Sequence, residues 1–161
     1  MTIADYNHCV DLHADGVFRF VMKHIRDKDA SRDIVQDSFE KMWRKLNTID
    51  GSKSKTYLFT TAYHTLIDHT RRESKKTTLS ENEHDQAVPG AHYSDLKEIL
   101  NRGLELLPDI QKSVLLLRDY EGYDYAKIGK ITDLSESQVK VYIFRARTFL
   151  KNYIGKMETV I

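Results

Sequence analysis

The stretch that decides the fold of this chain runs from residue 122 to residue 151 and reads GYDYAKIGKITDLSESQVKVYIFRARTFLK. Apolar residues recur at helical spacing over about residues 125–131, and again after a break at Thr132 and Asp133. Ser135 can cap the second of these helices, because its hydroxyl can accept a hydrogen bond from the free amides of the first turn. This pattern predicts a helix-turn-helix unit.

The second helix of this unit has two different faces. The face expected to pack in the core consists of Val139, Ile143, Ala146 and Leu150. The other, here called the recognition stripe, consists of Ser137, Lys140, Val141, Phe144 and Arg145. In a major groove, arginine suits the edge of guanine, and valine or phenylalanine suits a thymine methyl group. Arg147 and Lys151 are expected to contact phosphates, so the helix is predicted to read double-stranded DNA.

The rest of the chain is also expected to be helical, which makes the fold class all-α. Only two of the 161 residues are Pro and seven are Gly, too few for a fold rich in tight turns. Asp50-Gly51-Ser52 is nevertheless a strong turn signal. Upstream, one or two helices are expected between residues 6 and 25, with a possible break at Asp15-Gly16. A second helical segment is expected to be capped by Ser31 and to end near Asn47, and a third to cover about residues 55–74.

A polar stretch separates two parts of the chain. Residues 77–93 read TTLSENEHDQAVPGAHY and offer few apolar groups to bury, which is typical of a flexible linker. The boundary therefore divides the chain into residues 1–76 and 94–161. Helical spacing resumes at Leu96, and Pro108 is expected to start a further helix.

Charge is distributed unevenly, although the net charge is only +1. Residues 53–76 hold six basic and two acidic side chains, and residues 134–156 hold five basic and one acidic. Between them, residues 77–95 hold four acidic side chains and no Lys or Arg. Two basic patches around an acidic linker indicate two nucleic-acid contacts.

Composition argues against other classes of protein. The single Cys9 excludes an internal disulfide and fits a reduced, cytoplasmic setting, and neither a signal peptide nor an apolar run of about 20 residues is present. His64 and His69 are five residues apart, a spacing that diverges on a helix, and His8, Cys9 and His13 are expected in a core-facing segment. We expect no cofactor, no metal site and no catalytic residues, and therefore no enzyme.

Three motifs resemble one known family. They are DIVQDSFEKMWRKL at residues 33–46, YLFTTAYHTLIDHTRRESKK at residues 57–76, and LPDIQKSVLLLRDYEGYDYAKIGKITDLSESQVKVYIFRARTFL at residues 107–150. In this order they resemble the extracytoplasmic-function (ECF) sigma factors, which give bacterial RNA polymerase its promoter specificity. The resemblance implies two small helical domains that act together on one promoter.

The resemblance also implies where polymerase binds. Asp33, Gln36, Asp37 and Glu40 share one helical face, here called the acidic face. In the family this face docks on the clamp helices of the largest polymerase subunit, with an aromatic such as Trp43 as an anchor at its edge. The C-terminal domain is expected to meet the flap of the second subunit, and the linker to run toward the RNA path.

Promoter contacts follow from the same resemblance. A loop between Asn47 and Thr56 is expected to capture a base flipped out of the minus-ten element. The residues expected to contact this element are Lys53, Lys55, Tyr57, Tyr63, His64, Arg71 and Arg72. The residues expected to contact the minus-thirty-five element are the recognition stripe and Arg147. The chain departs from the family at Tyr57, often Trp, at His64, usually Asn, and at Asp133, commonly Gly.

The implied partners are RNA polymerase core, double- and single-stranded promoter DNA, and an anti-sigma factor, with the free protein a monomer. Two alternatives are a DNA-binding regulator that acts without polymerase, which would dimerise on a palindromic site, and a pure interaction module. The second alternative does not explain two basic patches.

Overall fold

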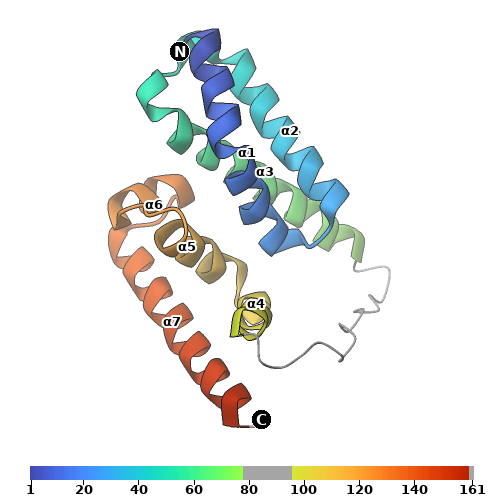
Figure 1. Ribbon diagram of the computed structural model, residues 1–161, viewed down its shortest axis with the longest axis vertical. Coiled ribbons are helices and arrows are strands. Elements are labelled where there is room, and N and C mark those ends of the chain that lie inside the picture. Colours follow the sequence, from blue (N-terminus) through green and yellow to red (C-terminus); the bar gives the residue numbers. More distant parts are fainter. Residues whose placement is uncertain (78–95, 160–161) are drawn as a thin grey trace. The chain divides into compact units, whose positions relative to one another are not determined.

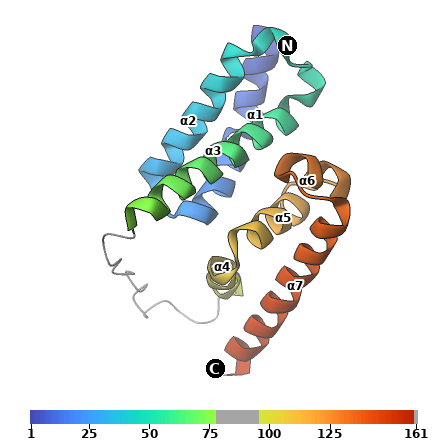
Figure 2. The same cartoon turned by 180° about the vertical axis from the view of Figure 1, so that it is seen from behind.

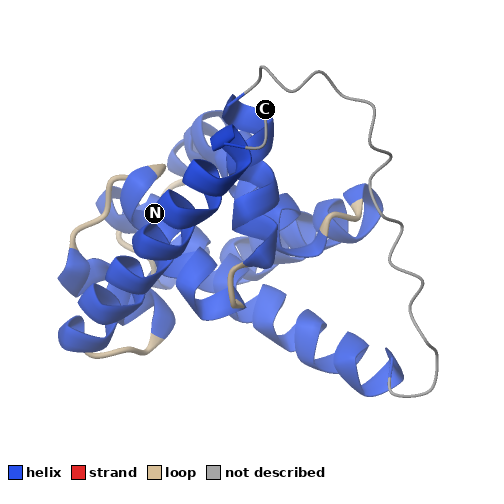
Figure 3. Ribbon diagram, turned by 90° about the horizontal axis from the view of Figure 1, so that it is seen from below, coloured by secondary structure: helices blue, strands red, loops and turns tan. Residues whose placement is uncertain are grey.

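The computed structural model describes residues 1–77 and 96–159, and its regular structure there is entirely helical (Figure 3). Two compact units make up the chain, Met1–Glu81 and Asn82–Ile161, here called unit 1 and unit 2. The division falls within residues 77–93, the predicted linker, which beyond Thr77 lies outside the described residues. The prediction of an all-α chain with two small helical units is confirmed.

Unit 1 consists of three long helices that lie side by side (Figures 1 and 2). They are α1 (Ile3–Ile25), α2 (Lys28–Arg44) and α3 (Ser54–Thr77). Two short 3-10 turns, η1 (Leu46–Thr48) and η2 (Gly51–Lys53), join α2 to α3. Each helix buries one apolar stripe against the other two, and this burial is the main force that holds the unit together. The most deeply buried side chains are Val17, Val21, Met42, Leu58, Phe59, Ala62 and Leu66.

The sequence left open whether residues 6–25 form one helix or two. The structure has a single helix, α1, so the possible break at Asp15-Gly16 is wrong. A capping box holds its first turn, in which the Asp5 amide donates to Thr2 Oγ1 (3.0 Å) and the Thr2 amide donates to Asp5 Oδ2 (2.9 Å). The helix continues through Gly16, because buried Val17, Phe20 and Val21 on the following turns anchor it. It ends at Arg26, which adopts the left-handed conformation with φ of 58°.

Helix α2 begins one turn earlier than predicted, and the assignment of Ser31 as its cap is wrong. Asp27 caps it, because Asp27 Oδ1 accepts hydrogen bonds from the amides of Asp29 (3.0 Å) and Ala30 (3.2 Å). Ser31 is instead a fully buried residue inside the helix. The helix also ends earlier, at Arg44, because the chain turns into η1 before Asn47.

Unit 2 packs three shorter helices against one long one. They are α4 (Leu96–Leu106), α5 (Asp109–Asp119) and α6 (Tyr125–Thr132), and all contact α7 (Glu136–Thr159) (Figures 1 and 2). Pro108 immediately precedes α5, in agreement with the prediction. Helices α4 and α7 cross closely at Gly103, where a Cβ atom would lie 2.8 Å from the Leu150 side chain.

The only cysteine of the chain offers a test of unit 1 packing. Cys9 is 2% exposed, and burial raises the pKa of its thiol, so both access and thiolate formation are suppressed. We expect iodoacetamide to alkylate Cys9 at least about thirtyfold more slowly in the native protein than in urea, because α1 must open first. Mass spectrometry of quenched time points measures the rates, and equal rates would show that α1 is not packed in this way.

Candidate DNA and polymerase interfaces

The helix-turn-helix of unit 2 is held by backbone contacts in its turn. Asp133 connects α6 to α7 in the left-handed conformation, with φ of 59°, as expected for a residue that stands where the family has Gly. The Leu134 amide donates to the Gly129 carbonyl (3.0 Å), and a Cβ atom on Gly129 would lie 2.6 Å from the Leu134 carbonyl oxygen. The turn therefore closes on the bare backbone of Gly129.

Ser135 caps α7, as predicted. Its hydroxyl accepts a hydrogen bond from the Gln138 amide (3.1 Å), and Gln138 Oε1 accepts one from the Ser135 amide (2.9 Å). On the first turns of α7, Val139, Ile143 and Ala146 are buried, as expected for the core face. The capped start and the buried face together fix which side of α7 is exposed.

The recognition stripe is that exposed side. All five of its residues are exposed, and Phe144 shows 71% of its surface to solvent. An apolar ring left so exposed contributes nothing to the core and is available to an outside surface. The stripe thus combines a hydroxyl, two cations and two apolar side chains, a set suited to base edges and phosphates in a major groove.

Two side chains that the sequence did not single out adjoin the recognition stripe. The ring of Tyr125, at the start of α6, lies close to both Arg118 (4.7 Å from ring centre to guanidinium carbon) and Lys140 (5.6 Å from ring centre to ammonium nitrogen). Lys140 also faces Glu136 at 3.8 Å. Arg118 and Tyr125 are far from the stripe in sequence, and only the fold of unit 2 reveals their proximity.

Arg147 is already engaged within unit 2. Its guanidinium donates to Asp119 Oδ1 at 2.6 Å, and this hydrogen bond raises the pKa of Arg147 further above its usual value. Both side chains are partly exposed, so the ion pair is a weak tether rather than a buried one. To contact a phosphate, as predicted, Arg147 would have to exchange this partner.

The acidic face of unit 1 lies along α2. Asp33, Gln36 and Glu40 are exposed, and Asp37 is half-buried and paired with Lys41 (3.3 Å), which in turn donates to Thr65 Oγ1 on α3 (3.1 Å). Trp43 is 48% exposed at the end of this helix and packs edge-on against the Tyr6 ring, 5.0 Å between ring centres. The acidic face thus presents hydrogen-bond acceptors beside the exposed ring of Trp43. Tyr6 holds that ring in place, as suits an interface anchor.

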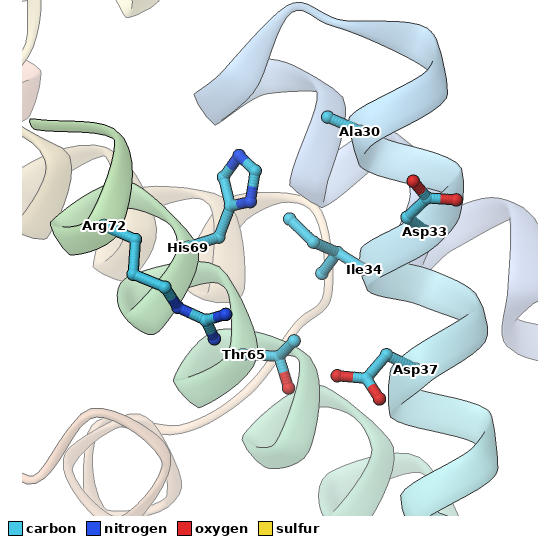
Figure 4. A pocket seen from close by; sticks show the side chains of 7 residues that line it. All are labelled: Ala30, Asp33, Ile34, Asp37, Thr65, His69 and Arg72. Atoms are coloured by element: carbon cyan, nitrogen blue, oxygen red, sulfur yellow. The ribbon is translucent and has the colours of Figure 1, made fainter. Parts of the chain in front are cut away.

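A groove of about 280 Å³ separates the acidic face from α3 (Figure 4). Asp33 and Asp37 stand on its α2 wall, and His69 and Arg72 on its α3 wall. Carboxylates and cations are thereby presented on neighbouring helices of one unit. Residues predicted to meet polymerase and residues predicted to meet DNA thus belong to adjacent surfaces.

Most residues predicted to contact the minus-ten element are accessible. Lys53, His64, Arg71 and Arg72 are exposed, and Lys55 and Tyr57 are half-buried. Tyr63 is not accessible, because only 6% of its surface is exposed and its ring lies edge-on to that of His64 (5.5 Å). Helical spacing turns Tyr63 toward the core beside Ala62 and Leu66, and its contact with DNA stays a prediction.

Two family models match the chain, Sigma-70 region 2 over residues 9–76 and Sigma-70 region 4 over residues 97–150. The chain is also 30% identical over 145 residues to the ECF RNA polymerase sigma factor SigM of Bacillus subtilis, covering 87% of this chain and 89% of that one. The chain belongs to the ECF sigma factor family. Another relative, the RNA polymerase sigma factor YlaC of Bacillus subtilis, is 31% identical over 87% of this sigma factor and 86% of that one.

A solved structure of low identity shares the fold of this sigma factor. It is the sigma factor RpoE of Bartonella quintana, solved in complex with the anti-sigma factor NepR, with a TM-score of 0.81 at 22% identity over 95% of this chain and 98% of that one. Like other sigma factors, this protein binds RNA polymerase core and directs promoter-specific initiation of transcription.

Residues 1–77 and 96–159 contain no group of three His, Cys, Asp or Glu side chains placed to hold a metal ion. Within the same ranges, no helix combines the length and the apolar character that a membrane span requires.

Proposed function

We propose that the two units divide promoter recognition between them. Unit 1 docks its acidic face and Trp43 on the clamp helices of the largest polymerase subunit, and melts the minus-ten element. Unit 2 reads the minus-thirty-five element with its recognition stripe, beside the flap of the second subunit. The observation that carries this division is the exposure of the two predicted contact faces on separate units.

Chemical complementarity supports the role of unit 1. Exposed carboxylates on α2 can accept charge-assisted hydrogen bonds from arginine side chains of a partner, and such bonds are stronger than neutral ones. A separated DNA strand could meet positive charge from Lys53, Arg71 and Arg72 and an aromatic group from half-buried Tyr57. Unwinding costs a few kcal/mol per flipped base, which these contacts must offset.

The proposal extends to partners and chemistry. RNA polymerase supplies catalysis, and this sigma factor supplies recognition alone, so it is no enzyme. An anti-sigma factor covers its contact surfaces when transcription is not required, which the RpoE relative solved with its anti-sigma factor supports. Outside the holoenzyme the protein is a monomer. Capture of bound proteins from native cells tests for polymerase subunits and for an inhibitor.

Alanine in place of Lys140 or Arg145 tests the role of unit 2. Each change is expected to lower transcription from the cognate promoter about tenfold or more, because one good base contact contributes about 1–3 kcal/mol. Binding to core polymerase should stay unchanged. A promoter library transcribed by the holoenzyme supplies the cognate sequence, and run-off transcription and core binding are then measured for each variant.

Lys156→Ala is the matched control for this test. It removes the same charge from α7, but roughly 24 Å further along the helix axis than Lys140. It should transcribe as well as the unmodified protein. The division of roles would be refuted if Lys140→Ala or Arg145→Ala lost core binding and kept its promoter preference.

A further inference from the structure

The loop between α2 and α3 rests on the first turns of α1. The Met1 amino group donates to the Ile49 carbonyl at 2.7 Å, which joins residues 48 positions apart. At the other end of the loop, the Ser54 hydroxyl adjoins the buried thiol of Cys9 on α1 and partly offsets the rise in the pKa of that thiol. The loop is therefore held at its middle by Met1, just before α1, and adjoins Cys9 of α1 at its junction with α3.

The loop also approaches α1 closely at Gly51. A Cβ atom there would lie 2.9 Å from Asp5 Oδ2, closer than real Cβ contacts allow, and 3.2 Å from Asp5 Cγ, tighter than most of them. Gly51 is not among the residues with positive φ, so the position requires glycine for space rather than for its backbone conformation. The Asp5 carboxylate is thus the surface on which the loop backbone rests.

Asp5 cannot simply turn away from Gly51. Its carboxylate accepts from the Thr2 amide (2.9 Å), and its own amide donates to Thr2 Oγ1 (3.0 Å), in the capping box of α1. Hydrogen bonds from Thr2 also lower the pKa of Asp5, which keeps the carboxylate charged and bonded. The capping box thus holds the side chain toward the loop, where it acts as a steric stop.

The loop is also ordered internally, and its polar side chains point outward. Asp50 Oδ1 accepts from the Ser52 amide (3.0 Å) and hydroxyl (2.8 Å), while Ile49 is buried. Asn47, Thr48 and Ser52 are exposed. The backbone of the loop thus contacts α1, and side chains able to hydrogen-bond a base remain accessible.

We propose that Asp5 is a positioning residue for base selection at the minus-ten element, because its carboxylate lies against Gly51 of the loop to which the family resemblance assigns capture of the flipped base. This inference rests on the proposed function of unit 1. The inference assigns a further role to the start of α1, which contacts no DNA in the proposed function. The start of α1 determines the position of the loop between α2 and α3.

Gly51→Ala tests the inference, assayed in the full chain bound to core polymerase. Transcription is measured from a promoter library randomised only at the minus-ten element. We expect the preferred sequence to lose at least about fivefold against its single-base variants, an effect comparable to the loss of one helix cap. Core binding and the minus-thirty-five preference should not change.

Two double variants separate a steric stop from a general disturbance. Asp5→Ala in the Gly51→Ala background removes the obstacle and should restore the preference to within about twofold. Asp5→Asn in the same background keeps the obstacle and should not restore it. An unchanged preference in Gly51→Ala, or rescue by neither or by both double variants, would overturn the inference.

Asn47→Ala distinguishes failure of the inference from failure of the proposed function. If Asn47→Ala alters the minus-ten preference and Gly51→Ala does not, the loop reads DNA without being positioned by Asp5, and only the inference fails. If neither the loop substitutions nor Arg72→Ala alters the preference while core binding persists, the proposed role of unit 1 at the minus-ten element fails as well.

Discussion

Replacing Gly129 with valine is expected to destabilise unit 2 strongly and to lower promoter-directed transcription, most of all at temperatures near the reduced melting point. The first side-chain atom would already stand 2.6 Å from the Leu134 carbonyl oxygen, where contacts under 3.0 Å force a shift. That oxygen belongs to the backbone of the turn, which cannot move without breaking the hydrogen bond from the Leu134 amide to the Gly129 carbonyl. Overpacking of this kind costs about 3 kcal/mol, which lowers the melting temperature of a domain this small by roughly 12–24 °C.

The single tryptophan makes the two units distinguishable in this experiment. Trp43 lies in unit 1, so its fluorescence follows that unit, whereas far-UV circular dichroism follows the helices of both. In Gly129→Val, part of the dichroism should be lost at lower temperature while the Trp43 transition is unchanged. Core binding by unit 1 should also persist.

Gly155→Val is the matched control for Gly129→Val. Gly155 also lies inside a helix of unit 2, but a Cβ atom there has no neighbour within 4 Å. The change should leave unit 2 as stable as before or slightly more stable, because valine is a better helix former than glycine. If both variants melted alike, the close contact at the turn would not be what distinguishes Gly129.

Reversing a charge on the acidic face is expected to weaken binding to core polymerase at least about tenfold. Asp33→Lys and Glu40→Lys each replace an exposed acceptor with a cation, two helical turns apart on α2. Charge-assisted hydrogen bonds contribute about 1.5–3 kcal/mol each, and 1.4 kcal/mol is a factor of ten in affinity. Titration of fluorescently labelled protein with core enzyme measures the affinity of each variant.

The matched control is Asp11→Lys, which makes the same charge change on α1, outside the acidic face. It should bind core as tightly as the unmodified protein. The losses in Asp33→Lys and Glu40→Lys should also shrink as salt is raised, because the contacts are exposed to solvent. Equal losses in all three variants would indicate a general effect of net charge and contradict docking through the acidic face.

The local elements of the fold were largely predictable from neighbouring residues. The capping pair Ser135 and Gln138 and the buried stripe through Val139 lie within one or two helical turns of each other. The assignment of Ser31 as the cap of α2 was wrong for an equally local reason. Asp27, one turn earlier, is also a good cap, and Ser31 lies on the buried side of the helix. The sequence made Tyr63 a candidate for DNA contact because an aromatic side chain suits a DNA strand as well as a core, and the structure buries it.

By itself, the sequence determined the all-α class, the helix-turn-helix with its exposed recognition stripe, and the membership of the ECF sigma factor family, because these depend on spacings of three and four residues and on motifs read along the chain. Only the tertiary structure decided which distant groups meet. The ion pair of Arg147 with Asp119, the ring of Tyr125 beside Lys140, and the contact of Gly51 with Asp5 join segments that the sequence keeps apart. No local pattern encodes such contacts, since they follow from how whole helices pack.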